Sequence, residues 1–252
     1  MVGQYNAIKD LKKHLTIEEA LVHVDFSENY SLKYAEVQSF HFRALYYSTE
    51  STYNEHQWSI CVDLKMVNFL LGQQSGYTKY PCFICLWDSR AKEDHWKKVV
   101  WPARENMTVG ASNIINKPLV DRGKNIFSPL HIKLGLMKQF VRALDKDGQC
   151  FKYIWVILQN LVNWIFFPGL SMEKIKAGIF SGPQIRQIIK DEQFLYTMTD
   201  IEASAWKSFV LVVHNFLGNH KSPNYEEIVQ KMLSDFKTLK ANMSLQHRFL
   251  MH

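Results

Sequence analysis

The sequence has few cysteines and lacks a long, uninterrupted hydrophobic run. Only four of its 252 residues are cysteine, which is too sparse for the disulfide framework of a secreted protein and favours a reducing, intracellular compartment. The N-terminal stretch "MVGQYNAIKDLKKHL" has no apolar core followed by small residues, so we expect no signal peptide. The most apolar stretch, residues 153–167, is interrupted by Gln159, Asn160 and Asn163. It is shorter than the roughly 20 residues that a bilayer requires, so we expect a buried helix and no membrane association.

The composition is that of a globular protein with a modest excess of basic residues. Hydrophobic residues make up 47% and charged residues 21% of the chain, without repeats or low-complexity tracts, so disorder is not expected. A chain of 252 residues can form one or two domains with a substantial core. The 30 Lys and Arg residues exceed the 24 Asp and Glu residues. This balance permits a polyanionic partner such as DNA without requiring one.

The hydrophobic pattern changes from strand-like to helical along the chain. Residues 20–26, 37–48 and 58–64 are apolar, β-branched or alternating, which predicts short strands. After residue 130 the apolar residues recur at three- and four-residue steps, which predicts helices. The first helix carries an apolar stripe of Leu130, Leu134, Met137, Val141 and Leu144.

Three segments follow from this change of pattern. We predict a partial α/β segment over residues 1–96, a loop or linker rich in Pro, Asn and Gly over residues 97–129, and a mostly α-helical domain over residues 130–252. The predicted fold class is therefore α+β. Long loops inside compact domains are uncommon and are often functional.

Two helices of the C-terminal part have start signals. Thr199 is followed three residues later by Glu202, which predicts a capping box, and Gly218 predicts the end of that helix. Ser222 as a cap, with Pro223 at the first helical position, predicts the start of the next one.

Two aspartates stand at the ends of predicted strands. Asp25 follows "LVHV" and Asp63 follows "SICV". Carboxylates on neighbouring strands can hold divalent metal ions, and in two-metal phosphoryl chemistry such ions stabilise the attacking and leaving oxygens. The alternative is that each aspartate only ends a strand or caps a helix.

The stretch "YPCFICLWDSRAKEDHW" contains a candidate metal site. Cys82 and Cys85 are separated by two residues, a spacing that lets both thiolates reach one zinc ion. His95 is a candidate third ligand and His131 a candidate fourth. Because buried free thiols are common, the alternative of two structural cysteines stays open.

Basic residues and tryptophans alternate directly after the cysteines. Trp87, Trp96 and Trp101 lie among cations that could contact phosphates while the rings stack on bases. The candidate DNA-binding residues are Arg90, Lys92, Lys97, Lys98 and Arg104. The alternative is a solvated loop whose tryptophans pack on the helical part.

The combination of "DLKMVNFLLGQQSGYTKYPCFICLWDSR", "PLVDRGKNIFSPLHIKLGLMKQFVRALDKDG" and "FLGNHKSPNY" resembles transposon-encoded proteins of animal genomes. Their middle block is similar to the aspartate, Gly-loop and CxxC arrangement of CACTA-type cut-and-paste transposases. The resemblance covers residues from Trp58 onward. It implies a partial ribonuclease H-like mixed sheet followed by a helical, insertion-type domain, and a parent chemistry of DNA cleavage and joining by an Asp, Asp, Glu triad with magnesium.

The resemblance also implies roles for single residues. Asp63 matches the second aspartate of the family, and Cys82, Cys85 and His95 match its zinc-binding positions. The block "HVDFSENY" is similar to the first-aspartate strand of a related transposon family, which would make Asp25 the first catalytic residue. An apolar insertion, "IWVILQNLVNWIF", separates "FKY" from "FPGL", and the chain stops at "SLQHRFLMH", before the segment that carries the third carboxylate in relatives.

We therefore expect a truncated or rearranged transposase-derived protein that is nuclear, binds DNA, takes no small-molecule substrate and does not catalyse transposition itself. Its zinc would be structural, and magnesium would bind only at an intact catalytic site. Two alternatives stay open: a non-catalytic helical module that binds DNA or a protein, and a decayed gene product without a function.

Overall fold

The computed structural model describes residues 21–24, 59–160, 171–218 and 221–252. The chain divides into two compact units. The N-terminal unit comprises Met1–Ala91 and Val100–Ser128, and the C-terminal unit comprises Lys92–Val99 and Pro129–His252. A short segment from the middle of the sequence thus belongs to the C-terminal unit. The predicted three-part division into residues 1–96, 97–129 and 130–252 stays a prediction.

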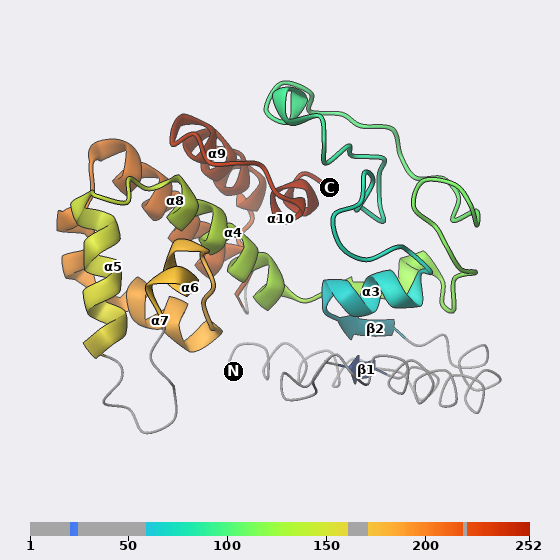
Figure 1. Ribbon diagram of the computed structural model, residues 1–252, viewed down its shortest axis with the longest axis horizontal. Helices are drawn as coiled ribbons and strands as arrows, with labels where there is room; N and C mark the ends of the chain where they lie inside the picture. The colour runs from blue at the N-terminus through green and yellow to red at the C-terminus, as the bar shows by residue number, and fades with distance from the viewer. Residues whose placement is uncertain (1–20, 25–58, 161–170, 219–220) are drawn as a thin grey trace. The chain divides into compact units, whose positions relative to one another are not determined.

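Helices account for most of the regular structure of the described residues (Figure 1). The N-terminal unit contains α3 (Leu64–Leu70) and the 3₁₀ turn η3 (Arg122–Lys124). The C-terminal unit contains η2 (Lys92–Asp94), α4 (Pro129–Ala143), α5 (Gln149–Asn160), α6 (Met172–Lys176), α7 (Gly182–Lys190), η5 (Glu192–Thr197), α8 (Asp200–Asn215), α9 (Tyr225–Thr238) and α10 (Leu245–Leu250).

The predicted α+β class, with a partial ribonuclease H-like mixed sheet, is wrong for the described residues, which are essentially all-α. Their strands are β1 (Leu21–Val24), β2 (Ser59–Val62) and β3 (Asn125–Phe127), each only three or four residues long. These strands pair in the order β1-β2-β3 and all run parallel, so they do not form a mixed sheet. Residues 37–48, which predicted further strands, lie outside the described residues.

Local signals end β2 and then fix the length of α3. The Asp63 carboxylate accepts a hydrogen bond from the Met66 backbone N–H at 2.7 Å and caps α3. At the other end Gly72, with φ +64°, closes the helix in a Schellman motif, because the Gln73 N–H donates to the Asn68 carbonyl at 2.7 Å. A Cβ at Gly72 would lie 2.0 Å from the Asn116 carbonyl oxygen, so this position requires glycine.

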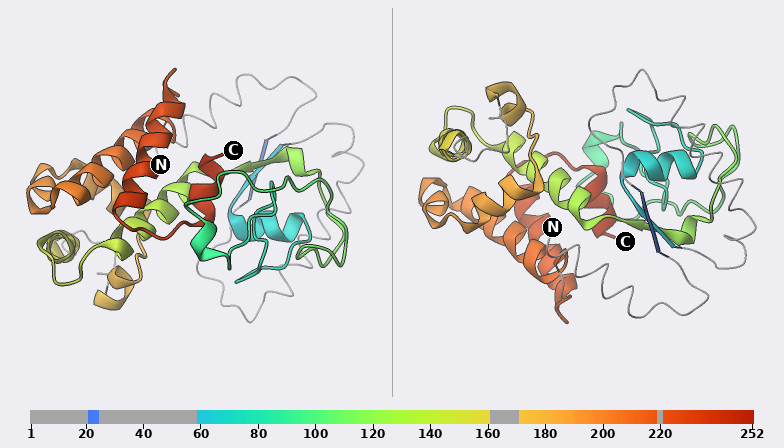
Figure 2. Two further views of the ribbon diagram at one scale, coloured as in Figure 1. Left: turned by 90° about the horizontal axis from the view of Figure 1, so that it is seen from above. Right: turned by 90° about the horizontal axis from the view of Figure 1, so that it is seen from below.

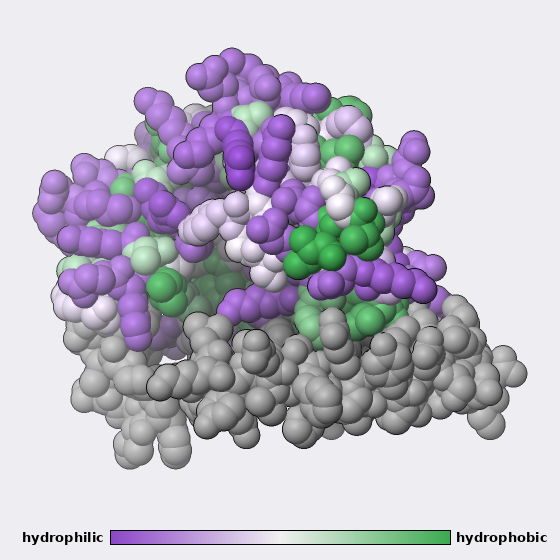
Figure 3. Space-filling view, turned by 45° about the vertical axis from the view of Figure 1, so that its right-hand side comes forward, coloured by the Kyte–Doolittle hydropathy of each residue, from purple (hydrophilic) through white to green (hydrophobic). Residues whose placement is uncertain are grey.

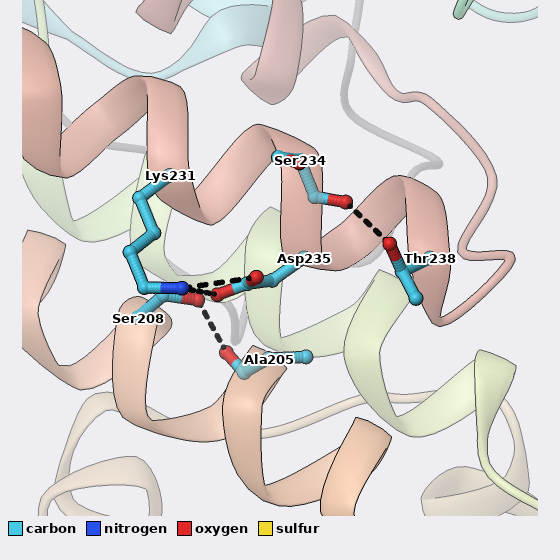
Figure 4. Close-up of polar contacts among 6 residues, drawn as sticks. All are labelled: Ala205, Ser208, Lys231, Ser234, Asp235 and Thr238. Atoms are coloured by element: carbon cyan, nitrogen blue, oxygen red, sulfur yellow. Dashed lines mark hydrogen bonds and ion pairs between the residues drawn. The ribbon is translucent and has the colours of Figure 1, made fainter.

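Aromatic residues from four helical segments form the core of the C-terminal unit. Trp206 of α8 lies 5.3 Å from Phe140 of α4 and 4.9 Å from Phe194 of η5, measured between ring centroids. Phe140 also contacts Phe236 of α9, at 6.3 Å. Helices α8 and α9 pack along each other, and polar contacts on this pair are shown in Figure 4. Burial of these rings supplies much of the stability of the unit.

The predicted apolar stripe of α4 is correct in part. Met137, Val141 and Leu144 are fully buried, whereas Leu130 and Leu134 remain half-exposed. The residues at the centre of the buried face, which the stripe omitted, are Ile132, Leu136 and Phe140. The buried face is therefore wider than one row of side chains, as expected for a helix covered on more than one side.

One helix-start prediction is confirmed and the other is wrong. The Glu202 carboxylate accepts from the Thr199 N–H at 2.9 Å, and the Thr199 hydroxyl accepts from the Glu202 N–H at 3.4 Å, so the capping box is present. Helix α9 begins at Tyr225 rather than Pro223, with Asn224 at the cap position. The Ser222 hydroxyl donates to the Asn224 side-chain oxygen at 2.6 Å instead of capping a helix.

In the described ranges, no helix combines the length and the apolar character needed to cross a bilayer. Helix α5 contains the beginning of the apolar run 153–167, whose end lies outside the described residues. Hydrophilic side chains cover most of the described surface seen in Figure 3, and hydrophobic ones form smaller patches.

The segment Lys92–Val99 is attached to the C-terminal end of the chain within its unit. The Trp96 indole N–H donates to the Ala241 carbonyl at 3.0 Å, and the Arg248 guanidinium donates to the Val99 carbonyl at 2.7 Å. The Trp96 ring also meets His247 edge-on at 5.8 Å. Both views of Figure 2 show the segment beside α10. These contacts hold residues from the middle of the sequence against α10 and the turn before it.

His247 is fully buried at the centre of these contacts. Its Nδ1 accepts from the Ser244 N–H at 3.2 Å, as the third residue of a capping box, and its ring meets Phe236 at 5.2 Å. Burial lowers the pKa of His247 to about 3. The folded chain therefore keeps this ring neutral under conditions in which an unfolded histidine is charged.

This burial predicts an acid-sensitive C-terminal unit. Below the ordinary histidine pKa of about 6.5 the unfolded state binds a proton that the folded state does not, so the free energy of unfolding falls by about 1.4 kcal/mol per pH unit. His247→Gln retains a side chain suited to the capping box but cannot titrate. In urea unfolding between about pH 6 and 4, we expect the unchanged chain to lose stability more steeply than the variant. Parallel losses would contradict this role of His247.

Candidate metal centre and basic segment

Cys82 and Cys85 lie together in a turn of the N-terminal unit. Both are free thiols, and both are buried, with 0% and 1% of their surfaces exposed. The Ile84 backbone N–H donates to the Cys82 sulfur at 3.4 Å. A hydrogen bond between the two thiols, followed by burial, raises the pKa of Cys82. Two adjacent thiolates are therefore unfavourable unless a cation offsets their charge, as a metal ion does.

The cysteine turn pairs with residues 102–104 in a short antiparallel arrangement. Cys85 forms a bridge with Ala103. The Leu86 N–H donates to the Pro102 carbonyl at 2.8 Å, and the Arg104 N–H donates to the Ile84 carbonyl at 2.9 Å. The segment Lys92–Val99, which lies between these two paired stretches in the sequence, belongs to the C-terminal unit.

Arg104 holds the cysteine turn from inside. Its side chain is 2% exposed, and its guanidinium donates to the carbonyls of Tyr80 at 2.9 Å, Cys82 at 3.0 Å and Ser112 at 2.9 Å. Burial lowers the pKa of Arg104, while the neighbouring cysteines act in the opposite direction. Among the described residues, the salt bridges formed do not include Arg104. The contact of Arg104 with DNA stays a prediction; in the structure this guanidinium is enclosed by backbone carbonyls.

A neighbouring loop completes the enclosure of the turn. The Tyr80 N–H donates to the Asn113 side-chain oxygen at 2.8 Å. Ser112 and Asn113 adopt left-handed backbone conformations, with φ of 47° and 71°. This geometry brings the Ser112 carbonyl to Arg104 and the Asn113 amide to Tyr80, so the loop is shaped around the cysteine turn.

Cys82 and Cys85 are the part of a candidate metal-binding group that lies within one unit of the described chain. Both belong to the N-terminal unit, so their two thiols are fixed within one body. The predicted ligands His95 and His131 belong to the C-terminal unit, where His95 is buried and His131, on α4, is half-buried. Their role as ligands stays a prediction.

The remaining basic candidates are exposed, whereas the tryptophans among them are largely covered. Arg90, Lys92, Lys97 and Lys98 are exposed at the surface. Trp87 and Trp101 are 3% and 8% exposed. Trp96 is half-buried and engaged with Ala241. Base stacking on Trp87 and Trp101 is therefore not supported, because these rings pack inside the protein.

Of the two predicted catalytic aspartates, one lies in the described part of the structure and the other does not. Asp25 lies outside the described residues. Asp63 directly follows β2 and is half-buried, with one carboxylate oxygen engaged in capping α3. The described residues thus use Asp63 in the way that the simpler alternative predicted, as a helix cap.

In a comparison with known proteins, two domain-family models match separate parts of this chain. A family model described as Domain of unknown function (DUF8703) matches residues 5–120, which include the cysteine turn. A second, described as Domain of unknown function (DUF8704), matches residues 129–218, beginning at the first residue of α4. No curated protein and no solved structure matches the chain.

Two residues of this region escaped the sequence analysis in their actual roles. Arg104 binds carbonyl groups, which every residue has, so no pattern of side chains signals its partners. Asn113 offered a weak signal, because asparagine is the residue other than glycine that most readily adopts a left-handed conformation.

The enclosure of Arg104 predicts a large loss of stability on its removal. Arg104→Met keeps an apolar stem but leaves three carbonyl oxygens without a donor, and each buried unsatisfied group costs about 1–3 kcal/mol. We expect a loss of about 3–5 kcal/mol in the urea unfolding of the N-terminal unit. Arg90→Met, at an exposed position of the same loop, should change stability by less than about 0.5 kcal/mol. Equal stability of the two variants would contradict the assigned role.

Proposed function

We propose that this chain is a DNA-binding protein derived from a cut-and-paste transposase, without catalytic activity, whose N-terminal unit is held by a structural zinc ion. The observation that carries the proposal is the basic segment Lys92–Val99. Its Lys92, Lys97 and Lys98 side chains are exposed, while Trp96 between them fixes the backbone to the C-terminal unit. Cations on a fixed backbone can contact phosphates with less loss of conformational entropy than cations on a mobile loop.

The absence of catalysis is inferred from the carboxylates. The parent chemistry suggested by the resemblance uses three, with magnesium ions held between them. Asp63 would be one of these, and one of its carboxylate oxygens is engaged in capping α3. No glutamate of the sequence can be assigned as the third. On this basis we propose that DNA is bound without being cleaved.

Zinc is the metal that suits the cysteine turn. Thiolates are soft ligands that favour zinc over magnesium or calcium, and a two-residue spacing is typical of structural zinc sites. Cys82 and Cys85 would supply two ligands, and His95 and His131 stay the ligands that the sequence predicts for the others. When bound, zinc would cross-link the turn without taking part in a reaction. A protein of this kind acts on chromosomal DNA, so the proposal also implies an intracellular, nuclear location.

The zinc proposal predicts the metal content of the purified protein. We expect a single zinc ion per chain by mass spectrometry, and its loss in Cys82→Ser, because a hydroxyl is a poor zinc ligand. Cys150→Ser is the matched control, since Cys150 is also a buried free thiol but lies on α5 in the other unit. The control should keep its zinc even if it is less stable. Unchanged zinc in Cys82→Ser, or none in the unchanged chain, would refute the site.

The DNA proposal predicts binding that depends on salt and not on magnesium. A labelled duplex of about 30 base pairs, close to three helical turns, is a suitable probe. The logarithm of the binding constant should fall with the logarithm of salt concentration between about 50 and 200 mM. The double variant Lys97→Gln, Lys98→Gln should lower the magnitude of that slope by about 2. Chelation of magnesium should change nothing, and magnesium-dependent cleavage of the duplex would contradict the proposal.

A further inference from the structure

The C-terminal unit brings two groups of lysines together that are far apart in the sequence. Trp96, next to Lys97, donates to the carbonyl of Ala241, which directly follows Lys240. Arg248 of α10 holds Val99 at the other end of the same segment. The basic segment therefore lies against the turn that joins α9 to α10. Two further exposed lysines lie here, Lys237 in the last turn of α9 and Lys240 in the connection that follows.

Lys240 occupies a backbone position that favours glycine. Its φ is 59°, and it closes α9 in a Schellman motif, in which the Ala241 N–H donates to the Phe236 carbonyl at 2.9 Å and the Lys240 N–H donates to the Lys237 carbonyl at 3.0 Å. Two other helices among the described residues end in the same motif, and there the left-handed residue is glycine, Gly72 after α3 and Gly178 after α6. A residue with a Cβ is less stable at such a position.

The helix dipole accounts for only part of this arrangement. The carboxyl end of α9 favours a nearby cation, which explains a lysine in the last turn, such as Lys237. It does not explain why the residue with positive φ is lysine, because glycine would satisfy the same motif with less strain. A strained residue that persists in a fold is an indication of function. The property that Lys240 has and glycine lacks is an exposed positive charge.

The other charges on this surface leave it basic. The segment itself includes two exposed carboxylates, Glu93 and Asp94. Against them stand five exposed lysines, Lys92, Lys97, Lys98, Lys237 and Lys240. Lys231, earlier on α9, is paired with Asp235 at 3.1 Å, as Figure 4 shows.

We propose that Lys237 and Lys240 join Lys92, Lys97 and Lys98 in one phosphate-contacting face for duplex DNA, and that Lys240 accepts backbone strain in order to place a cation there. This inference rests on the DNA binding proposed above and specifies where the DNA lies. The face belongs entirely to the C-terminal unit. It combines a rigid helix end with a segment that is tied to it, so the spacing of its cations is set by the fold.

Lys240→Gly separates binding from stability in a single variant. Relief of the left-handed strain should raise the melting temperature by about 2–4 °C. Loss of one phosphate contact should weaken binding of the labelled duplex about fivefold near 150 mM salt, and reduce the magnitude of the salt slope by about 1. A variant that is more stable and binds more weakly cannot owe its weaker binding to unfolding.

Three further variants complete the test on the full-length chain. Lys240→Asn tolerates positive φ without the charge and should also bind weakly. Lys240→Arg keeps the charge and should bind as the unchanged chain does. Lys190→Ala removes an exposed lysine at the end of α7, a helix that packs on α4 and α5, and should leave the salt slope unchanged.

The outcomes distinguish a failure of this inference from a failure of the proposed DNA binding on which it rests. If the unchanged chain does not bind the duplex, the proposed DNA binding fails and this inference with it. If the unchanged chain binds and Lys240→Gly binds equally well, the DNA lies elsewhere and this inference alone is overturned. If Lys190→Ala weakens binding as much as Lys240→Gly does, net charge rather than this face is responsible, which also overturns it.

Discussion

The organisation of the N-terminal unit depends on the need to satisfy backbone polar groups where regular structure is scarce. Between the end of α3 and the start of η3 the described chain forms η2, which belongs to the other unit, and isolated bridges. Carbonyls in such a loop must find donors elsewhere when they are buried. Arg104 meets this requirement with three donations that converge on the cysteine turn and on the loop beside it. A charged side chain thus supplies hydrogen bonds to backbone carbonyls that helices and sheets supply in other proteins.

The same constraint connects the buried arginine with the cysteines. A buried guanidinium is unfavourable unless its charge is offset. The titratable groups that raise the pKa of Arg104 are the thiols of Cys82 and Cys85. Ionised sulfur would offset the charge of the guanidinium, and a soft metal ion bound to the two thiols would keep them ionised.

The sequence was informative where a signal is local and uninformative where the partners are distant. Thr199 and Glu202 are three residues apart and predicted the capping box that forms. The partners of Arg104 are main-chain carbonyls as many as 24 residues away, which have no side-chain signature. The segment Lys92–Val99 likewise depends on Ala241 and Arg248, about 145 residues later in the chain. Thus the single lysines could be named from the sequence, but the surface that they share could not.

Asp63 illustrates why one pattern can indicate two structures. An aspartate at the end of an apolar run is equally suited to project into a catalytic site and to cap the helix that follows, because both uses require an exposed carboxylate at a strand end. The residues after it decide between them. Here the helix "LKMVNFL" begins directly after Asp63. The Met66 N–H in its first turn has no acceptor within the helix, and it donates to the Asp63 carboxylate. A donor that is already in place competes with any metal for that oxygen. In both places a helix end decides the use of a charged residue: the Met66 N–H engages Asp63 at the start of α3, and the left-handed position after α9 is occupied by Lys240.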